Sequence, residues 1–155
     1  MLAFDKIDRG ISMSLLEKIL VPLDGSEHSL HALEKALQIA KKFEGKITLI
    51  YVYSVRVGSF AITPIQVYSY VQDFRKYGKD ILTDGEKQVK AEGVQVETIL
   101  KEGHIVEEIL KTSREGNFDL IVIGARGISK MKEFFLGSVS HGVTTHAPCP
   151  VLIVN

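Results

Sequence analysis

The chain of 155 residues has a single cysteine, Cys149, and no tryptophan. One cysteine excludes an intrachain disulfide, and its place between two prolines favours a small packing residue over a nucleophile. The apolar runs are far too short to span a bilayer. Charged residues interrupt the first ten positions, so no continuous apolar signal core is present. We therefore expect a cytoplasmic protein that has no membrane partner.

The chain also lacks an excess of charge of either sign. Nineteen basic residues balance nineteen acidic ones, which argues against a broad nucleic-acid surface. The 45% hydrophobic content is that of an ordinary globular protein, and the length suits one domain. We expect this domain at residues 17–155. Residues 1–16 form an N-terminal extension of mixed character, which we expect to be loosely ordered or docked on a partner.

Apolar runs and helical patterns alternate along the chain. Strands are predicted at residues 18–23, 46–53, 94–100, 119–123 and 150–154. Helices are predicted from the Ser26 cap to about residue 43, then at about 70–92, 103–114 and 137–146. Such alternation predicts a single-domain α/β fold of the Rossmann-like type, an open parallel five-stranded sheet with helices on both faces.

Residues 57–72 contain no charged side chain but are rich in aromatic and β-branched residues. Two interpretations stay open for this stretch. It is either a loop folded over the domain, or a flap or partner-binding surface, because exposed apolar patches usually have a use. The helix expected after it contains Gly78 and Gly85, which weaken the helical pattern.

A glycine motif follows the fourth predicted strand. It reads Gly124-Ala125-Arg126-Gly127, then nine residues, then Gly137-Ser138-Val139-Ser140. Glycines let the backbone approach a ligand, and a helix beginning at Gly-Ser offers free N–H groups to phosphate. The motif is neither a Walker A loop nor the Gly-x-Gly-x-x-Gly of dinucleotide folds. The alternative is that the glycines merely form a turn and a helix cap.

The spacing Gly-x2-Gly-x9-Gly-Ser resembles the nucleotide motif of the universal stress protein family. The opening run from Ile19 to Ser26 and the closing run from Pro148 to Val154 are similar to the same family. The resemblance covers about residues 17–154. It implies a strand order of 3-2-1-4-5, which leaves a crevice between strands one and four at their carboxyl ends.

The resemblance implies which residues would bind ATP in this crevice. Asp24 is expected at the ribose or base edge, although a turn or helix-start aspartate is the alternative role. The backbone of Val52 is expected to meet adenine, with simple core packing as the alternative. The base pocket would be completed by Pro22, Leu23 and Ile123.

The phosphates are expected at the glycine motif. Gly124 and Gly127 would let the loop approach them, and Gly137, Ser138, Val139 and Ser140 would donate hydrogen bonds. Arg126 is either a phosphate ligand or an exposed arginine. Mg2+ would accompany the phosphates, since no protein cage for a metal is evident. His28 and His31 lack an evident third ligand, so an exposed helical face is favoured for them.

The resulting hypothesis is an ATP-binding stress-response or signalling module. No side chain is an evident base for activating water, so we expect no enzymatic activity beyond a weak ATPase. The alternatives are a protein-interaction module whose crevice is empty or holds AMP, and a slow ATP hydrolase or phosphoryl-transfer enzyme. The apolar edge strand at 151–154 predicts a homodimer, and a further protein partner is unknown.

Overall fold

The computed structural model describes residues 16–55, 63–128 and 136–155. Five parallel strands form one sheet in the order β3-β2-β1-β4-β5, which confirms the predicted fold class and strand order. The strands are β1 (Lys18–Pro22), β2 (Lys46–Tyr53), β3 (Val96–Glu102), β4 (Leu120–Gly124) and β5 (Val151–Val154). The third strand begins two residues later than predicted, because the Val94 amide still donates to Val89 O at the end of the preceding helix.

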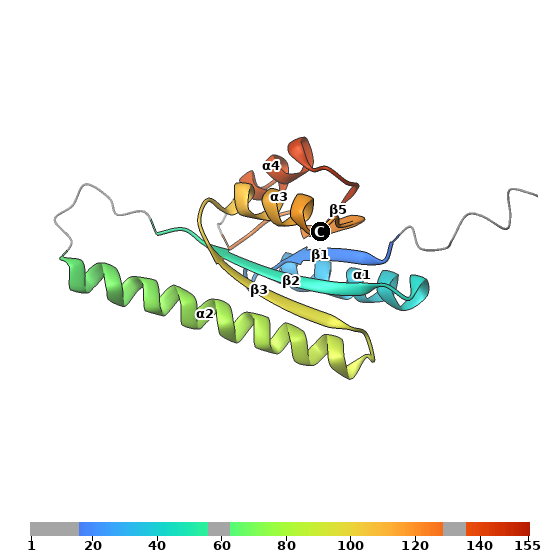
Figure 1. Ribbon diagram of the computed structural model, residues 1–155, viewed down its shortest axis with the longest axis horizontal. Helices are drawn as coiled ribbons and strands as arrows, with labels where there is room; N and C mark the ends of the chain where they lie inside the picture. Colours follow the sequence, from blue (N-terminus) through green and yellow to red (C-terminus); the bar gives the residue numbers. More distant parts are fainter. Residues whose placement is uncertain (1–15, 56–62, 129–135) are drawn as a thin grey trace, which may run out of the picture.

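Helices cover both faces of the sheet (Figure 1). One face carries α1 (Glu27–Phe43) and α2 (Pro64–Ala91), and the other carries α3 (Ile105–Glu115) and α4 (Ser138–His146). In the described part of the chain, no helix combines the length and hydropathy that crossing a membrane requires.

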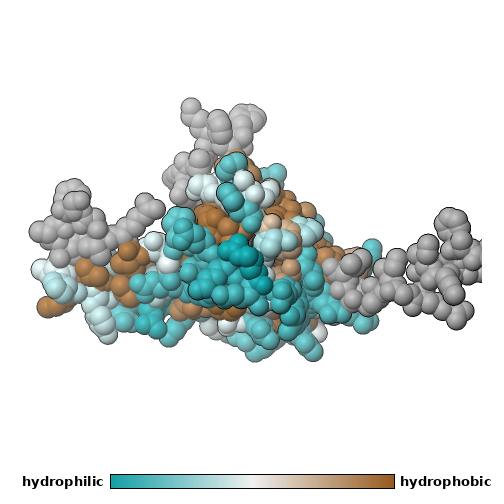
Figure 2. Space-filling view, turned by 45° about the horizontal axis from the view of Figure 1, so that its top comes forward, coloured by the Kyte–Doolittle hydropathy of each residue, from teal (hydrophilic) through white to brown (hydrophobic). Residues whose placement is uncertain are grey.

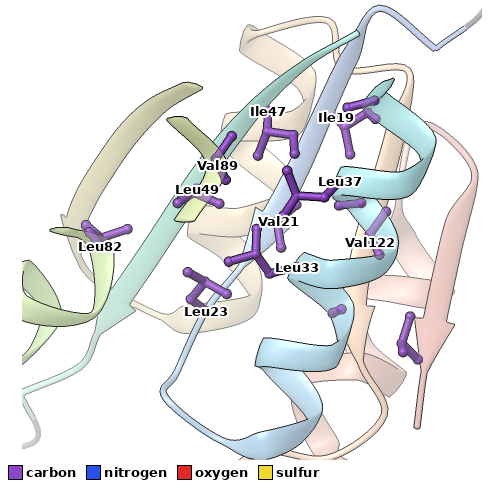
Figure 3. Packing of buried hydrophobic residues seen from close by; sticks show 14 of the residues in the cluster. Ile19, Val21, Leu23, Leu33, Leu37, Ile47, Leu49, Leu82, Val89 and Val122 are labelled. Atoms are coloured by element: carbon purple, nitrogen blue, oxygen red, sulfur yellow. The ribbon is translucent and has the colours of Figure 1, made fainter. Parts of the chain in front are cut away.

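Two apolar clusters fill the space between the sheet and its helices. Under α1 and α2, Leu33 and Leu37 pack with Val21 and Ile47, and Leu82 and Val89 pack with Leu49 (Figure 3). Under α3 and α4, a second cluster is built from the alternate residues of the same strands. Since successive side chains of a strand point to opposite faces, the continuous apolar runs of β1, β2 and β4 supply both clusters.

The start of α1 is as predicted. Ser26 has extended backbone angles, and its hydroxyl accepts a hydrogen bond from the Ser29 amide at 3.2 Å, so it is the N-cap. The helix ends at Glu44, which adopts the left-handed conformation with φ of 55°.

The second helix begins earlier than predicted, at Pro64 rather than near Tyr70. Thr63 accepts from the Gln66 amide, and the Gln66 side chain accepts from the Thr63 amide, forming a reciprocal capping box ahead of a first-turn proline. The expectation of a loop folded over the domain is therefore wrong for residues 64–72. Residues 57–62 of that stretch lie outside the described residues.

The glycines of α2 do not interrupt it. Gly78 and Gly85 are buried where the helix meets β2. A Cβ on Gly78 would lie 2.7 Å from Tyr51 Cε1, and one on Gly85 would lie 2.9 Å from Leu49 Cδ1. These positions are glycine because the helix approaches the strand too closely for a side chain, and this packing offsets their low helix propensity.

Candidate nucleotide site

A pocket of about 380 Å³ lies at the carboxyl ends of the strands. The pocket is lined by all twelve residues that were predicted as site residues from the sequence: Pro22, Leu23, Asp24, Val52, Ile123, Gly124, Arg126, Gly127, Gly137, Ser138, Val139 and Ser140. The connections after β1 and β4 lead to opposite faces of the sheet, to α1 and α4. The strand order thus leaves space at the place where ligands bind in folds of this type.

Asp24 joins the two halves of this site. Its Oδ1 accepts from the Ser26 amide at 2.9 Å and from the Ser26 hydroxyl at 2.5 Å, which fixes the turn into α1. Its Oδ2 accepts from the Ile128 amide at 3.2 Å, in the loop after β4. Asp24 therefore does have the alternative role of a turn aspartate, and it also holds the glycine loop. Oδ1 already accepts two hydrogen bonds, so Oδ2 is the oxygen that retains acceptor capacity for a ligand.

The glycine that ends β4 and the glycine in the loop after it are both required by their neighbours in the protein. A Cβ on Gly124 would lie 2.7 Å from the backbone carbon of His28, so this glycine lets β4 pack against the start of α1. A Cβ on Gly127 would lie 2.6 Å from Asp24 Oδ2. The position of Gly127 is therefore tied to the Asp24 contact, which could not be predicted from the sequence alone.

The N-terminus of α4 faces the same pocket. The Gly137 amide donates to Ala125 O at 2.8 Å, and the His141 amide donates to Gly137 O in the first helical hydrogen bond. Gly137 supplies no side-chain cap. The amides of Ser138, Val139 and Ser140 precede that first bond and belong to residues that line the pocket. This arrangement suits an anionic group.

The Ser140 hydroxyl was expected to donate a hydrogen bond to phosphate, but it donates to the protein backbone instead. Its hydroxyl is buried and lies 2.8 Å from Ala125 O and 2.9 Å from Gly137 O. One hydroxyl has one proton, and these carbonyls already accept it. The Ser140 hydroxyl thus stabilises the loop, whereas Ser138 is exposed at the pocket.

The pocket has an aliphatic side and an aromatic side. Val52 and Ile123 belong to the cluster under α3 and α4, together with Ile109. Tyr51 and Tyr53 belong to the cluster on the other face of the sheet. The pocket therefore spans the end of β2 and includes side chains from both faces.

Aromatic contacts fix the second of these sides. The rings of Tyr53 and Phe74 are nearly parallel, 10° apart in plane with centroids 6.5 Å apart, and Tyr77 meets Tyr51 edge-on at 6.1 Å. Burial raises the pKa of Tyr51, and Tyr77 and the Asp24 carboxylate raise it further. Burial also raises the pKa of Tyr53, and the hydrogen bond to Glu102 adds to this effect.

Eight further residues line the pocket but were not predicted from the sequence: Ser29, Tyr51, Tyr53, Ser54, Phe74, Ile105, Ile109 and Ile128. Three of them lie next to Val52 or follow it at the end of β2, namely Tyr51, Tyr53 and Ser54. Extending the prediction of Val52 to its neighbours in the sequence would have found them. No local signal marks Phe74, because its place depends on how α2 crosses β2.

The two histidines of α1 are placed differently from expectation. His28 is only partly exposed, and its Nδ1 is buried without a hydrogen-bond partner in the described part of the chain. The exposed-face interpretation is therefore wrong for His28. His31 Nδ1 lies 3.2 Å from Asn155 O, next to the end of β5. Cys149 is partly buried, with its sulfur 3.5 Å from Ser113 Oγ.

This fold defines a doubly wound α/β protein with a pocket at the switch point of its sheet. The model of the universal stress protein family matches residues 16–155. The chain belongs to this family.

Relatives and solved structures agree with that assignment. Universal stress protein YxiE of Bacillus subtilis is 37% identical over 148 residues, covering 91% of this chain and 100% of that protein. Universal stress protein MJ0531 of Methanocaldococcus jannaschii is 35% identical over 144 residues, covering 92% and 84%. The structure of UspA from Lactobacillus plantarum gives a TM-score of 0.78 at 26% identity, covering 89% of this chain and 97% of that one. A universal stress protein in complex with cAMP gives 0.70 at 28% identity, covering 92% and 99%.

Proposed function

We propose that this protein binds ATP with Mg2+ in the pocket and acts as a cytoplasmic stress-response or signalling module. The observation that carries the proposal is the start of α4, where three amides precede the first helical hydrogen bond beside the glycine loop. A polyphosphate supplies the negative charge that such a helix end favours. The solved relative in complex with cAMP supports a nucleotide as ligand.

The base belongs on the aliphatic side of the pocket in this proposal. Val52 and Ile123 line that side, and Val52 is the last residue but one of β2. Pro22 and Leu23 are buried and close the pocket at the end of β1. Apolar walls with a few backbone polar groups are the usual surroundings of a bound ring.

The phosphates belong at the N-terminus of α4. The amides of Ser138, Val139 and Ser140 and the Ser138 hydroxyl are the donors, and Arg126, which is partly exposed, is close enough to the pocket to add a positive charge. The residues present fit a nucleotide whose own phosphate oxygens hold Mg2+, since that ion prefers oxygen ligands and keeps several waters. When bound, Mg2+ supplies charge neutralisation for the phosphates.

Slow hydrolysis or none is expected of the isolated protein. Asp24 is the carboxylate at the pocket wall, and its two oxygens already accept hydrogen bonds from Ser26 and Ile128. Those bonds hold the carboxylate toward the protein. We therefore favour a binding module over an ATPase.

A protein-interaction role is a second candidate, favoured by the exposed start of α2. Ile65 is 81% exposed and Tyr68 is 67% exposed, and Figure 2 shows hydrophobic side chains at this end of the molecule. Apolar groups gain little by facing water. In this version the pocket is empty or holds AMP, and the unknown protein partner covers the helix.

We also propose a homodimer that forms through β5. This strand lies at the sheet edge, and Leu152 is 38% exposed. An edge strand offers unpaired backbone groups to a second copy, and two-fold association is the commonest closed symmetry.

Mass spectrometry of gently purified protein tests the nucleotide assignment. ATP retained in stoichiometric amount is the expected result, and its conversion over time separates a carrier from an enzyme. Calorimetry with ATP and Mg2+ should then show weaker binding for Gly127→Val, whose side chain crowds both the phosphates and Asp24. A folded Gly127→Val variant that binds ATP as tightly as the parent would contradict the phosphate site.

A further inference from the structure

The pocket is lined by side chains from both faces of the sheet. Val52 points to one face of the sheet, whereas Tyr51 and Tyr53 point to the other, yet all three line the same pocket. Neighbouring residues of a strand cannot contact one face of the same ring, because their side chains leave the strand in opposite directions. A base held on the Val52 side therefore leaves the aromatic side of the pocket unfilled.

We propose that Tyr51, Tyr53 and Phe74 form a second subsite, which takes a planar ring joined through a phosphate chain to the nucleotide in the first subsite. The ligand class is a dinucleotide of the dinucleoside polyphosphate type. This subsite rests on the proposed nucleotide binding and specifies which nucleotide the pocket takes.

The aromatic side is held ready for a ring. Tyr53 is 6% exposed and lies parallel to Phe74, whereas Phe74 is 43% exposed and lines the pocket from α2. Phe74 therefore packs on Tyr53 while part of its ring remains accessible. Tyr51 is fixed in the same way by the edge of Tyr77. Rings that are already ordered lose little conformational freedom when they stack on a ligand.

Asp24 links the glycine loop to the aromatic side of the pocket, because its carboxylate accepts from the Ile128 amide and its charge acts on the Tyr51 hydroxyl. In this proposal the phosphate chain runs from the start of α4 toward the aromatic side. A polar group of the second nucleoside would find the Ser54 hydroxyl, which also lines the pocket.

Binding assays with matched ligands test this subsite. Adenosine tetraphosphate and diadenosine polyphosphates with three, four or five phosphates are titrated with Mg2+, so that the second nucleoside is the main difference. A ring stacked on an aromatic side chain should make the best-fitting dinucleotide bind about 5- to 100-fold more tightly than adenosine tetraphosphate.

Two leucine substitutions in α2 locate that gain. Phe74→Leu keeps an apolar side chain against Tyr53 but removes the ring, so it should abolish most of the gain and weaken adenosine tetraphosphate binding much less. Tyr68→Leu is the matched control, because Tyr68 is 67% exposed on the same helix and does not line the pocket. Equal effects of Phe74→Leu on both ligands, or no gain in the parent protein, would overturn the subsite.

Nuclear Overhauser effects give an independent reading. Contacts between the Phe74 ring protons and an adenine ring are expected with the dinucleotide and not with adenosine tetraphosphate. Their absence at saturation would also overturn the subsite. Failure of the parent protein to bind any of these ligands is a separate result that removes the proposed nucleotide binding itself.

Discussion

Gly127→Ala tests the contact between Asp24 and the glycine loop. The new Cβ would lie 2.6 Å from Asp24 Oδ2, inside the closest approach of a carbon and an oxygen. Gly127 does not have a positive φ, so the backbone itself accepts alanine. The carboxylate must move, and the hydrogen bond from Ile128 is weakened or lost.

The free energy of unfolding follows from two opposing terms. A hydrogen bond to a charged group contributes about 1.5–3 kcal/mol, and we take about 1–2 kcal/mol because Asp24 is only partly buried. Alanine in place of glycine restricts the unfolded chain, which raises the free energy of unfolding by about 0.4–1 kcal/mol. The net destabilisation in the parent protein is therefore about 0–1.6 kcal/mol, by these same terms.

A double-mutant cycle with Asp24→Ala isolates the contact. Without the carboxylate no clash remains, so Gly127→Ala should stabilise that variant by about 0.4–1 kcal/mol. Urea unfolding followed by circular dichroism measures each corner of the cycle, and the expected coupling is about 1–2 kcal/mol. An equal effect of Gly127→Ala in both backgrounds would refute the argument that Asp24 explains this glycine.

Three further substitutions test the packing, the titration and the assembly. Gly78→Ala should destabilise the fold by about 1–3 kcal/mol through overpacking against Tyr51, despite a gain of about 1 kcal/mol in helix propensity. Chemical unfolding measures this, with Ser69→Ala at an exposed position of the same helix as the control. A Gly78→Ala variant that is more stable than the parent would contradict the close packing. The raised pKa of Tyr53 contributes stability that is fully present below the pKa of the unfolded state, near 10, and is lost as pH rises through the pKa of the folded state. The melting temperature of the parent should therefore fall more steeply above pH 10 than that of Tyr53→Phe. Parallel curves for the two proteins would contradict this role of Tyr53. Leu152→Lys should lower the mass measured by light scattering if β5 forms the dimer, whereas a parent protein that stays monomeric at high concentration would exclude that interface.

The sheet could be predicted because its strands carry their own signal. The runs at Ile19–Val21 and Leu120–Ile123 are apolar at every position, as strands buried on both faces must be. Strand ends in a parallel sheet lie at one edge, and the family resemblance supplied the order that makes strands one and four neighbours, so Asp24 and Gly124 could be brought together.

The second helix could not be predicted in the same way. Its start depends on Thr63 and Pro64, which the uncharged stretch around them obscured. The interaction that makes Gly78 favourable is with Tyr51, on a different element. Helix propensity is a local property, and here tertiary packing overrides it. Phe74 was missed for the same reason, since it reaches the pocket only after α2 has packed on β2.

The residues of the glycine motif are required both for packing of the loop and, in our proposal, for contact with phosphate. Substitutions differ in how well they distinguish these two roles. Gly124 is fixed by the backbone of His28, and Gly127 is close to Asp24. A loss of nucleotide binding in variants of either residue would reflect the packing of the loop as well as its contact with phosphate. Ser138 is a cleaner reporter, because it is exposed, lines the pocket and begins α4. Weaker ATP binding by Ser138→Ala, with an unchanged unfolding midpoint, would therefore be direct support for a phosphate at the helix N-terminus, which no glycine variant in this loop can give.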